Sequence, residues 1–359
     1  MFCLLVLMCF GERLDERSIR DIEAAQRDIL LYSSKYLRVF ALVPNFLSKV
    51  VFRNRLNTVR KLRQRQSDIF LPLIRARRVR LKMENKEGEE ERFVYSYVDS
   101  LFKINLTEEG GRRLCDEEIV VLCSEFLTAG TDTTAAVLQW TMAQIVDRRA
   151  VQEKLVEEIE KVTGRNGDEP TEDDLQKMPY LKAVVMEGLR RHPPAHFVLP
   201  HAVTKDVEFE GWLIPKNSSV NFMVADFGWD DKVWKDPMEF KPERFMEGGD
   251  GEGVDITGSR EIKMMPFGVG RRICPGMGLA MLHIEYFVAN LMMPFGVGRR
   301  ICPGMGLAML HIEYFVANLV KEFEWETADG EKVDFSEKSE FTTVMKKPLR
   351  VRITARRNR

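Results

Sequence analysis

The clearest chemical pattern in this sequence is a cysteine set among glycines and arginines, and it occurs twice. Residues 264–291 and 292–319 are identical at every position. Each copy contains the pattern Phe-x-x-Gly-x-Arg-x-Cys-x-Gly. Glycines let a backbone pass close to a flat group and adopt dihedral angles that other residues avoid. The cysteine precedes an expected helix, whose N-terminal amides stabilise a thiolate. The pattern therefore predicts a thiolate beside backbone that can approach a flat group closely, unless the cysteine is only a packed free thiol in a glycine-rich turn.

The two copies offer the same side chains for this chemistry. They are Phe267, Arg272, Cys274 and Gly276 in the first copy, and Phe295, Arg300, Cys302 and Gly304 in the second. Each arginine lies two residues before the cysteine and can form a charge-assisted hydrogen bond with an anionic group. Identical tandem copies do not indicate a solenoid, because such repeats diverge and need about three units to bury a core. They indicate a recent duplication or a mis-joined gene model.

Two further motifs lie on expected helices. Glu187 and Arg190 share one helix face, although such a pair alone is usually a surface salt bridge of little energy. Residues 129–134 (Ala-Gly-Thr-Asp-Thr-Thr) fall midway along a helix expected from Ile119 to about Val146. Their poor helix propensity predicts a widened turn, unless the threonines only hydrogen-bond back to carbonyls of the preceding turn.

These motifs and the segment Lys-Pro-Glu-Arg-Phe at residues 241–245 occur in the order found in cytochromes P450. The chain resembles that family over nearly its whole length, and most closely its plant microsomal members. The resemblance implies haem b (iron protoporphyrin IX) as cofactor, with a cysteine thiolate as the axial ligand that favours O–O cleavage. It also implies a buried ion network of Glu187, Arg190 and Arg244 that holds the back of the haem pocket.

The resemblance implies roles for four residues of the long helix and for one histidine after it. Asp132 and Thr133 would relay protons during oxygen activation, while Ala129 and Gly130 would leave room for O2. His201 stands where many family members carry an arginine or histidine that binds a haem propionate.

Only one of the two loop cysteines can be the axial ligand. If Cys302 is the ligand, the surplus copy is an insertion in the irregular segment 246–263, where extra chain is tolerated best. The alternative, Cys274, keeps the short approach from Arg244 but disrupts the end of a helix. The sequence therefore favours Cys302.

The elements that must position these residues are mostly helices. Apolar residues recur at helical spacing over Asp15–Tyr36 and Leu47–Met83, whereas short β-like runs follow Pro193, and residues 342–355 are typical of a strand pair. The expected fold class is mainly α with a small β-rich region, a partial cytochrome P450 fold, in a single domain over residues 1–359. The family's membrane anchor, first helices and W-x-x-x-R haem contact have no counterpart, so we expect the N-terminal portion to be lacking.

The charge and cysteine content of the chain bear on its binding partners and its cellular compartment. The formal net charge is −1, so no global field favours nucleic acid. The basic residues between Arg53 and Lys82 are expected to be the solvated face of amphipathic helices. The six cysteines include no CxxC pair, which is typical of a reducing compartment.

The activity that the resemblance implies is haem-thiolate monooxygenation. One oxygen atom from O2 would enter a small apolar substrate, with electrons from NADPH-cytochrome P450 reductase. The resemblance implies a location at the cytosolic face of the endoplasmic reticulum membrane, through an anchor that we expect this chain to lack. The alternative is an inactive truncated remnant, or a gene-model artefact, without a stable haem site.

Overall fold

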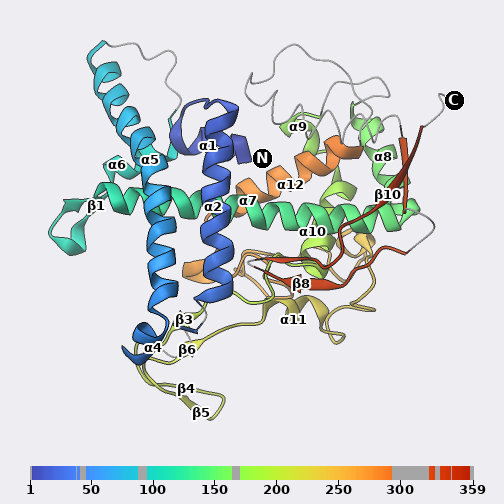
Figure 1. Cartoon of the computed structure of the whole chain (residues 1–359). Helices are drawn as coiled ribbons and strands as arrows, with labels where there is room; N and C mark the ends of the chain where they lie inside the picture. Colours follow the sequence, from blue (N-terminus) through green and yellow to red (C-terminus); the bar gives the residue numbers. More distant parts are fainter. Residues whose placement is uncertain are drawn as a thin grey trace. The chain divides into compact units, whose positions relative to one another are not determined.

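The computed structural model describes residues 2–37, 39–40, 46–87, 95–163, 170–292, 323–327, 332–340 and 342–355 (Figure 1). These residues divide into two compact units, the first reaching Asp132 and the second beginning at Thr133. The boundary falls inside the long helix α7 (Asp116–Asp147), which therefore contributes to both units.

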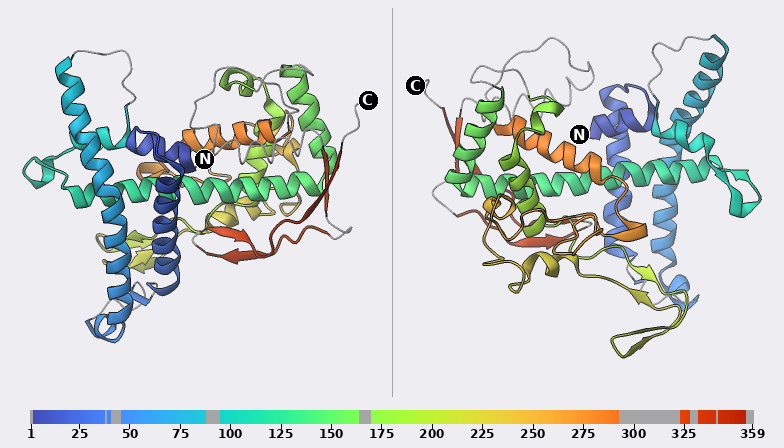
Figure 2. Two further views of the ribbon diagram at one scale, coloured as in Figure 1. Left: turned by 45° about the horizontal axis from the view of Figure 1, so that its top comes forward. Right: turned by 180° about the vertical axis from the view of Figure 1, so that it is seen from behind.

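The first unit is built from helices. They are α1 (Phe2–Phe10), α2 (Glu16–Tyr36), α4 (Phe46–Val51), α5 (Arg53–Glu87), α6 (Tyr97–Lys103) and the first part of α7, with β1 (Asn105–Leu106), β2 (Arg112–Arg113) and the 3-10 turn η2 (Thr107–Glu109) before it. Helices α2 and α5 run side by side (Figure 2). Helix α2 begins after Asp15, whose carboxylate accepts the backbone N–H of Arg17 at 2.9 Å and of Ser18 at 3.0 Å. This cap satisfies donors that the first turn leaves free.

Buried polar contacts fix the helices of the first unit against one another. Gln66 of α5 donates to the hydroxyl of Ser124 on α7 at 2.8 Å, and Gln26 of α2 donates to the Ser124 carbonyl at 2.9 Å. Arg77 of α5 and Asp99 of α6 form a buried ion pair at 2.6 Å. Because an unpaired buried polar group is costly, these contacts favour one register of the helices.

The second unit combines helices with short strands. Its helices are the rest of α7, α8 (Arg149–Thr163), α9 (Glu172–Leu175), α10 (Pro179–Arg191), α11 (Val224–Trp229) and α12 (Met277–Met292), with 3-10 turns η3 (Pro242–Phe245) and η4 (Gly270–Arg272). Its strands are β3 (His201–Ala202), β4 (Val207–Phe209), β5 (Trp212–Ile214), β6 (Ser219–Val220), β7 (Phe323–Thr327), β8 (Glu337–Ser339), β9 (Thr343–Met345) and β10 (Val351–Ala355). The core lies between α8, α10 and α12, where Leu155, Val184 and Val288 are fully buried.

The described strands pair in twos and antiparallel: β1 with β2, β3 with β6, β4 with β5, β7 with β10, and β8 with β9. The expected pairing within residues 342–355 is wrong, because β9 and β10 each pair with an earlier strand. A segment containing Pro348 separates these two strands, and Lys346 donates its backbone N–H to Ser336 at 2.8 Å, which extends the pairing of β9 with β8.

The mostly helical architecture with small antiparallel sheets confirms the expected fold class. Among the described helices, none is long and apolar enough to cross a membrane.

Candidate functional site

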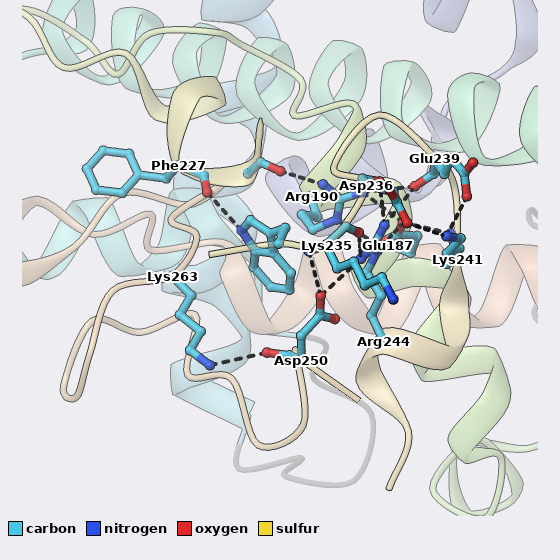
Figure 3. A network of polar contacts seen from close by, with 12 residues as sticks. Glu187, Arg190, Phe227, Lys235, Asp236, Glu239, Lys241, Arg244, Asp250 and Lys263 are labelled. Carbon is cyan, nitrogen blue, oxygen red and sulfur yellow. Dashed lines mark hydrogen bonds and ion pairs between the residues drawn. The ribbon is translucent and has the colours of Figure 1, made fainter. Parts of the chain in front are cut away.

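Three charged residues meet in the second unit, from two elements far apart in the sequence (Figure 3). Glu187 and Arg190 lie one turn apart on α10. Arg190 donates to both carboxylate oxygens of Glu187, from Nε at 2.7 Å and from Nη2 at 2.8 Å. Arg244 of η3 reaches the same carboxylate through Nε at 3.4 Å. The structure therefore brings together the three residues that the sequence placed in one ion network, and all three are buried.

Backbone carbonyls and a second carboxylate complete the partners of the two guanidinium groups. Arg190 also donates to the carbonyls of Gly228 and of Glu239, the latter at 3.2 Å. Arg244 donates to Asp250 Oδ2 at 3.0 Å and to the carbonyls of Lys235 and Asp236. A buried charge costs several kcal/mol unless it is paired. Two cations therefore face two carboxylates, and this balance lets both arginines be buried.

Sequence reasoning missed the part played by Asp250. This residue lies in the glycine-rich turn after η3, where an acid is ordinary solvated turn chemistry. Its contact with Arg244 depends on the path of residues 246–263, and local patterns do not determine that path. The backbone carbonyls that accept hydrogen bonds from Arg190 could not be predicted from the sequence either, because every residue type has a carbonyl.

The first cysteine loop has a defined backbone geometry. Cys274 donates its backbone N–H to the carbonyl of Phe267 at 2.9 Å, which closes the loop. Inside it, Gly268 and Gly270 take φ values of +67° and +70°, a region that glycine enters without the clash of a Cβ. Helix α12 begins at Met277, directly after the loop, and the Cys274 side chain is partly exposed. The thiol therefore lies just ahead of a helix N-terminus, where a thiolate is stabilised.

Of the other loop residues, only those of the first copy lie within the described part of the chain. Arg272 ends the turn η4 and is exposed, and Gly276 follows the cysteine with its own backbone carbonyl accepting the N–H of Ala280 at 2.8 Å. The second copy, with Phe295, Arg300, Cys302 and Gly304, lies outside the described residues.

His201 carries a buried nitrogen without a hydrogen-bond partner. The residue lies in β3, where its ring meets Phe222 edge-on at 5.9 Å. Its Nδ1 is inaccessible to solvent and finds no partner among the residues that the structure describes. Because a buried polar atom without a partner is costly, this nitrogen is suited to a partner from outside the chain.

The motif of residues 129–134 runs through α7 without interruption. The helix is α-helical throughout, so the widened turn is not observed. Instead, the Thr131 hydroxyl donates to the Leu127 carbonyl at 2.7 Å, the threonine back-bonding that the sequence left open. A Cβ on Gly130 would lie 3.0 Å from a methyl carbon of Leu5 in α1. Within the first unit, the Leu5 side chain thus occupies the space left by the absent side chain of Gly130, the residue after Ala129. Asp132 and Thr133 follow, half-buried, on the same turn.

A buried histidine anchors the end of α10 to α7. His192 stacks on Trp140, with ring centroids 4.4 Å apart, and its Nε2 lies 2.6 Å from the amide nitrogen of Gln144. Burial, reinforced by the positive charge of Arg191, lowers the pKa of His192 to about 2. The imidazole is therefore neutral and accepts from the amide. This contact fixes the helix that carries Glu187.

A family model described as Cytochrome P450 matches residues 1–292 and 291–355. The chain belongs to the cytochrome P450 family. The two matched segments meet at residues 291–292, where the first copy of the repeat ends.

Plant cytochromes P450 are among the similar proteins. Cytochrome P450 89A9 of Arabidopsis thaliana is 43% identical over 368 residues, covering 99% of this chain and 64% of that protein. Flavonoid 3'-monooxygenase of Arabidopsis thaliana is 38% identical over 59% of this chain and 41% of its own length. Geraniol 8-hydroxylase of Catharanthus roseus is 36% identical over the same two shares. The chain thus spans less than two thirds of the length of the relatives that it matches. The expected membership of the plant P450 group is confirmed.

Proteins of this family bind haem b, and the described residues suit that group. The loop of Cys274 presents a partly exposed thiol ahead of a helix, with two glycines in conformations that leave no side chain in the way. The unpartnered Nδ1 of His201 and the exposed guanidinium of Arg272 are donors of the kind that carboxylates such as haem propionates accept from.

Proposed function

We propose that this chain is a haem-thiolate monooxygenase. It inserts one oxygen atom from O2 into a small apolar organic substrate, using electrons from NADPH-cytochrome P450 reductase. The observation that carries the proposal is the cysteine loop, closed between Phe267 and Cys274 and followed directly by α12. The names of the similar plant proteins, a monooxygenase and a hydroxylase among them, support the same reaction class.

The chain's own residues have separate tasks in this proposal. A loop cysteine would ligate the iron, Phe267 and Gly276 would contact the macrocycle, and Arg272 and His201 would bind its propionates. In the second copy, Phe295, Arg300 and Gly304 are equivalent to Phe267, Arg272 and Gly276. When bound, the haem supplies the chemistry that activates O2.

The motif residues of α7 are proposed to transfer protons and to leave room for O2. Asp132 and Thr133 carry protons toward the reacting oxygen, a task suited to an acid beside a hydroxyl. Ala129 and Gly130, with their small side chains, would leave room for O2 beside the helix.

The ion network has a supporting role. Glu187, Arg190 and Arg244 do not touch the substrate; they hold α10 and η3 together behind the site. We place the protein at the cytosolic face of the endoplasmic reticulum membrane, where the proposed reductase partner would reach it.

The test is haem loading followed by turnover. The expressed chain should bind haem and give the thiolate-type absorption of its reduced carbon monoxide complex. With NADPH, a plant reductase and a panel of small apolar compounds, 18O2 should label a product with one oxygen atom. A folded chain that takes up no haem, or binds it without the thiolate absorption, would contradict the proposal and favour the inactive remnant.

A further inference from the structure

Two identical segments compete for one place in the second unit, and residues of the first copy fill it. Met264, Ile284, Val288 and Ala289 are at most 2% exposed and belong to the core cluster formed with α8 and α10. Helix α12, which makes up most of this copy, contacts α8, α9 and α10. We propose that the first copy is the one built into the fold and that Cys274, rather than Cys302, is the haem ligand. The statement about the ligand rests on the proposed function.

The packing inside the repeat cannot decide between the copies. Because their sequences are identical, every core contact that one copy makes is open to the other at the same energy. The surplus copy has the same length in either arrangement, so the entropy of closing it as a loop differs little. The two arrangements therefore differ mainly where the docked copy joins the rest of the chain.

The upstream junction favours the first copy. Lys263, the residue before it, donates Nζ to the Asp250 carbonyl at 3.1 Å (Figure 3). Asp250 in turn accepts from Arg244 at 3.0 Å, so the ion network is joined to the start of the repeat. Gly258, in the connecting segment, packs so closely on Val269 of the loop that a Cβ there would clash. The path from Arg244 to the loop is thus packed along its length.

Docking the second copy would break this junction. Leu291 precedes the second copy in the sequence, and a leucine side chain has no group to donate to Asp250.

The downstream junction offers little to offset that loss. Helix α12 ends at Met292, whereas Val320 would follow the docked copy in the other arrangement. One apolar residue replaces another there, and such exchanges usually change stability little. The upstream contacts therefore decide in favour of Cys274.

The repeat itself supplies matched variants for the test. Ile284→Ala and Ile312→Ala change equivalent positions in the two copies, and thermal unfolding of the haem-free full chain compares them. Because Ile284 is 1% exposed in the core, its truncation should lower Tm. The loss can be no larger than the cost of docking the second copy instead, since that copy offers the same core contacts. Ile312→Ala should leave Tm within about 1 °C, as substitutions outside a core usually do. If Ile284→Ala does not fold, Ile284→Val and Ile312→Val give the same comparison at smaller amplitude.

Cys274→Ala and Cys302→Ala then test the ligand. Cys274→Ala should lose the thiolate-type absorption of the reduced carbon monoxide complex, and Cys302→Ala should keep it. A chain lacking residues 292–319 is the single-copy reference, because deleting either copy yields the same polypeptide.

Two outcomes would overturn the proposal. One is an Ile312→Ala variant destabilised as much as Ile284→Ala, or more; the other is loss of the thiolate absorption in Cys302→Ala. If neither the full chain nor the single-copy chain binds haem, the proposed function fails. The unfolding comparison of the isoleucine variants still decides which copy is docked.

Discussion

Glu187→Gln should be among the most damaging single substitutions in the second unit. The change keeps the side-chain shape but removes the carboxylate that Arg190 contacts through two hydrogen bonds. Arg244 retains Asp250, whereas Arg190 is left without a carboxylate and keeps only neutral acceptors, the amide oxygen of the new glutamine and the carbonyls of Gly228 and Glu239. Removing one partner of a buried ion pair costs about 3–5 kcal/mol, and both side chains here are fully buried. We expect a loss of that size in the free energy of unfolding.

Urea unfolding followed by tryptophan fluorescence measures this loss, since Trp234 lies under the Arg190 guanidinium at 5.3 Å. Glu153→Gln is the control, because its ion pair with Arg149 is exposed and such pairs contribute at most about 1 kcal/mol. The double variant Glu187→Gln/Arg190→Met should recover part of the loss by removing the stranded cation. A loss for Glu187→Gln no larger than that of the control would refute the buried-charge reasoning.

Three further predictions concern other buried groups. Burial alone raises the pKa of Asp99, but hydrogen bonds from Arg77 and Ser96 outweigh burial and hold the pKa below its usual range. The free energy of unfolding should therefore fall as pH drops below about 4. Asp99→Asn should remove this pH dependence in acid-unfolding curves. Because the pKa of His192 is lowered in the folded state, the unfolded state binds one more proton than the folded state as pH falls. The free energy of unfolding should therefore fall by about 1.4 kcal/mol per pH unit below about pH 6.5. His192→Phe should flatten this slope in urea titrations at several pH values. Gly188→Ala should lower Tm despite the better helix propensity of alanine, because the added methyl would clash with the hydroxyl of Thr141 at a cost of about 1–3 kcal/mol. Adding Thr141→Ala removes that hydroxyl and should restore Tm. A double variant whose Tm stays low would contradict the steric explanation.

Local patterns predicted the elements, whereas contacts distant in sequence settled their partners. The range of α2 follows from the spacing of its apolar residues, and the structure adds the cap at Asp15. The pairings of β9 and β10 did not follow, because strand pairing depends on partners elsewhere in the chain. Likewise, the sequence indicated why Gly130 is a glycine in general terms, but only packing shows that Leu5 fills the space beside it.

The ion network was predictable as a set of residues but not as a device that reaches the cysteine loop. Its charges do not need to be there for stability alone, since apolar replacements of a buried ion network are often as stable. What apolar side chains cannot provide is the contact of Arg244 with the carboxylates of both Glu187 and Asp250, and the backbone carbonyl of Asp250 in turn accepts from Lys263. Lys263 is the last residue before the repeat copy that holds Cys274. The network therefore fixes where the loop begins, and this positional role explains why two arginines are buried in a core that could be built without them.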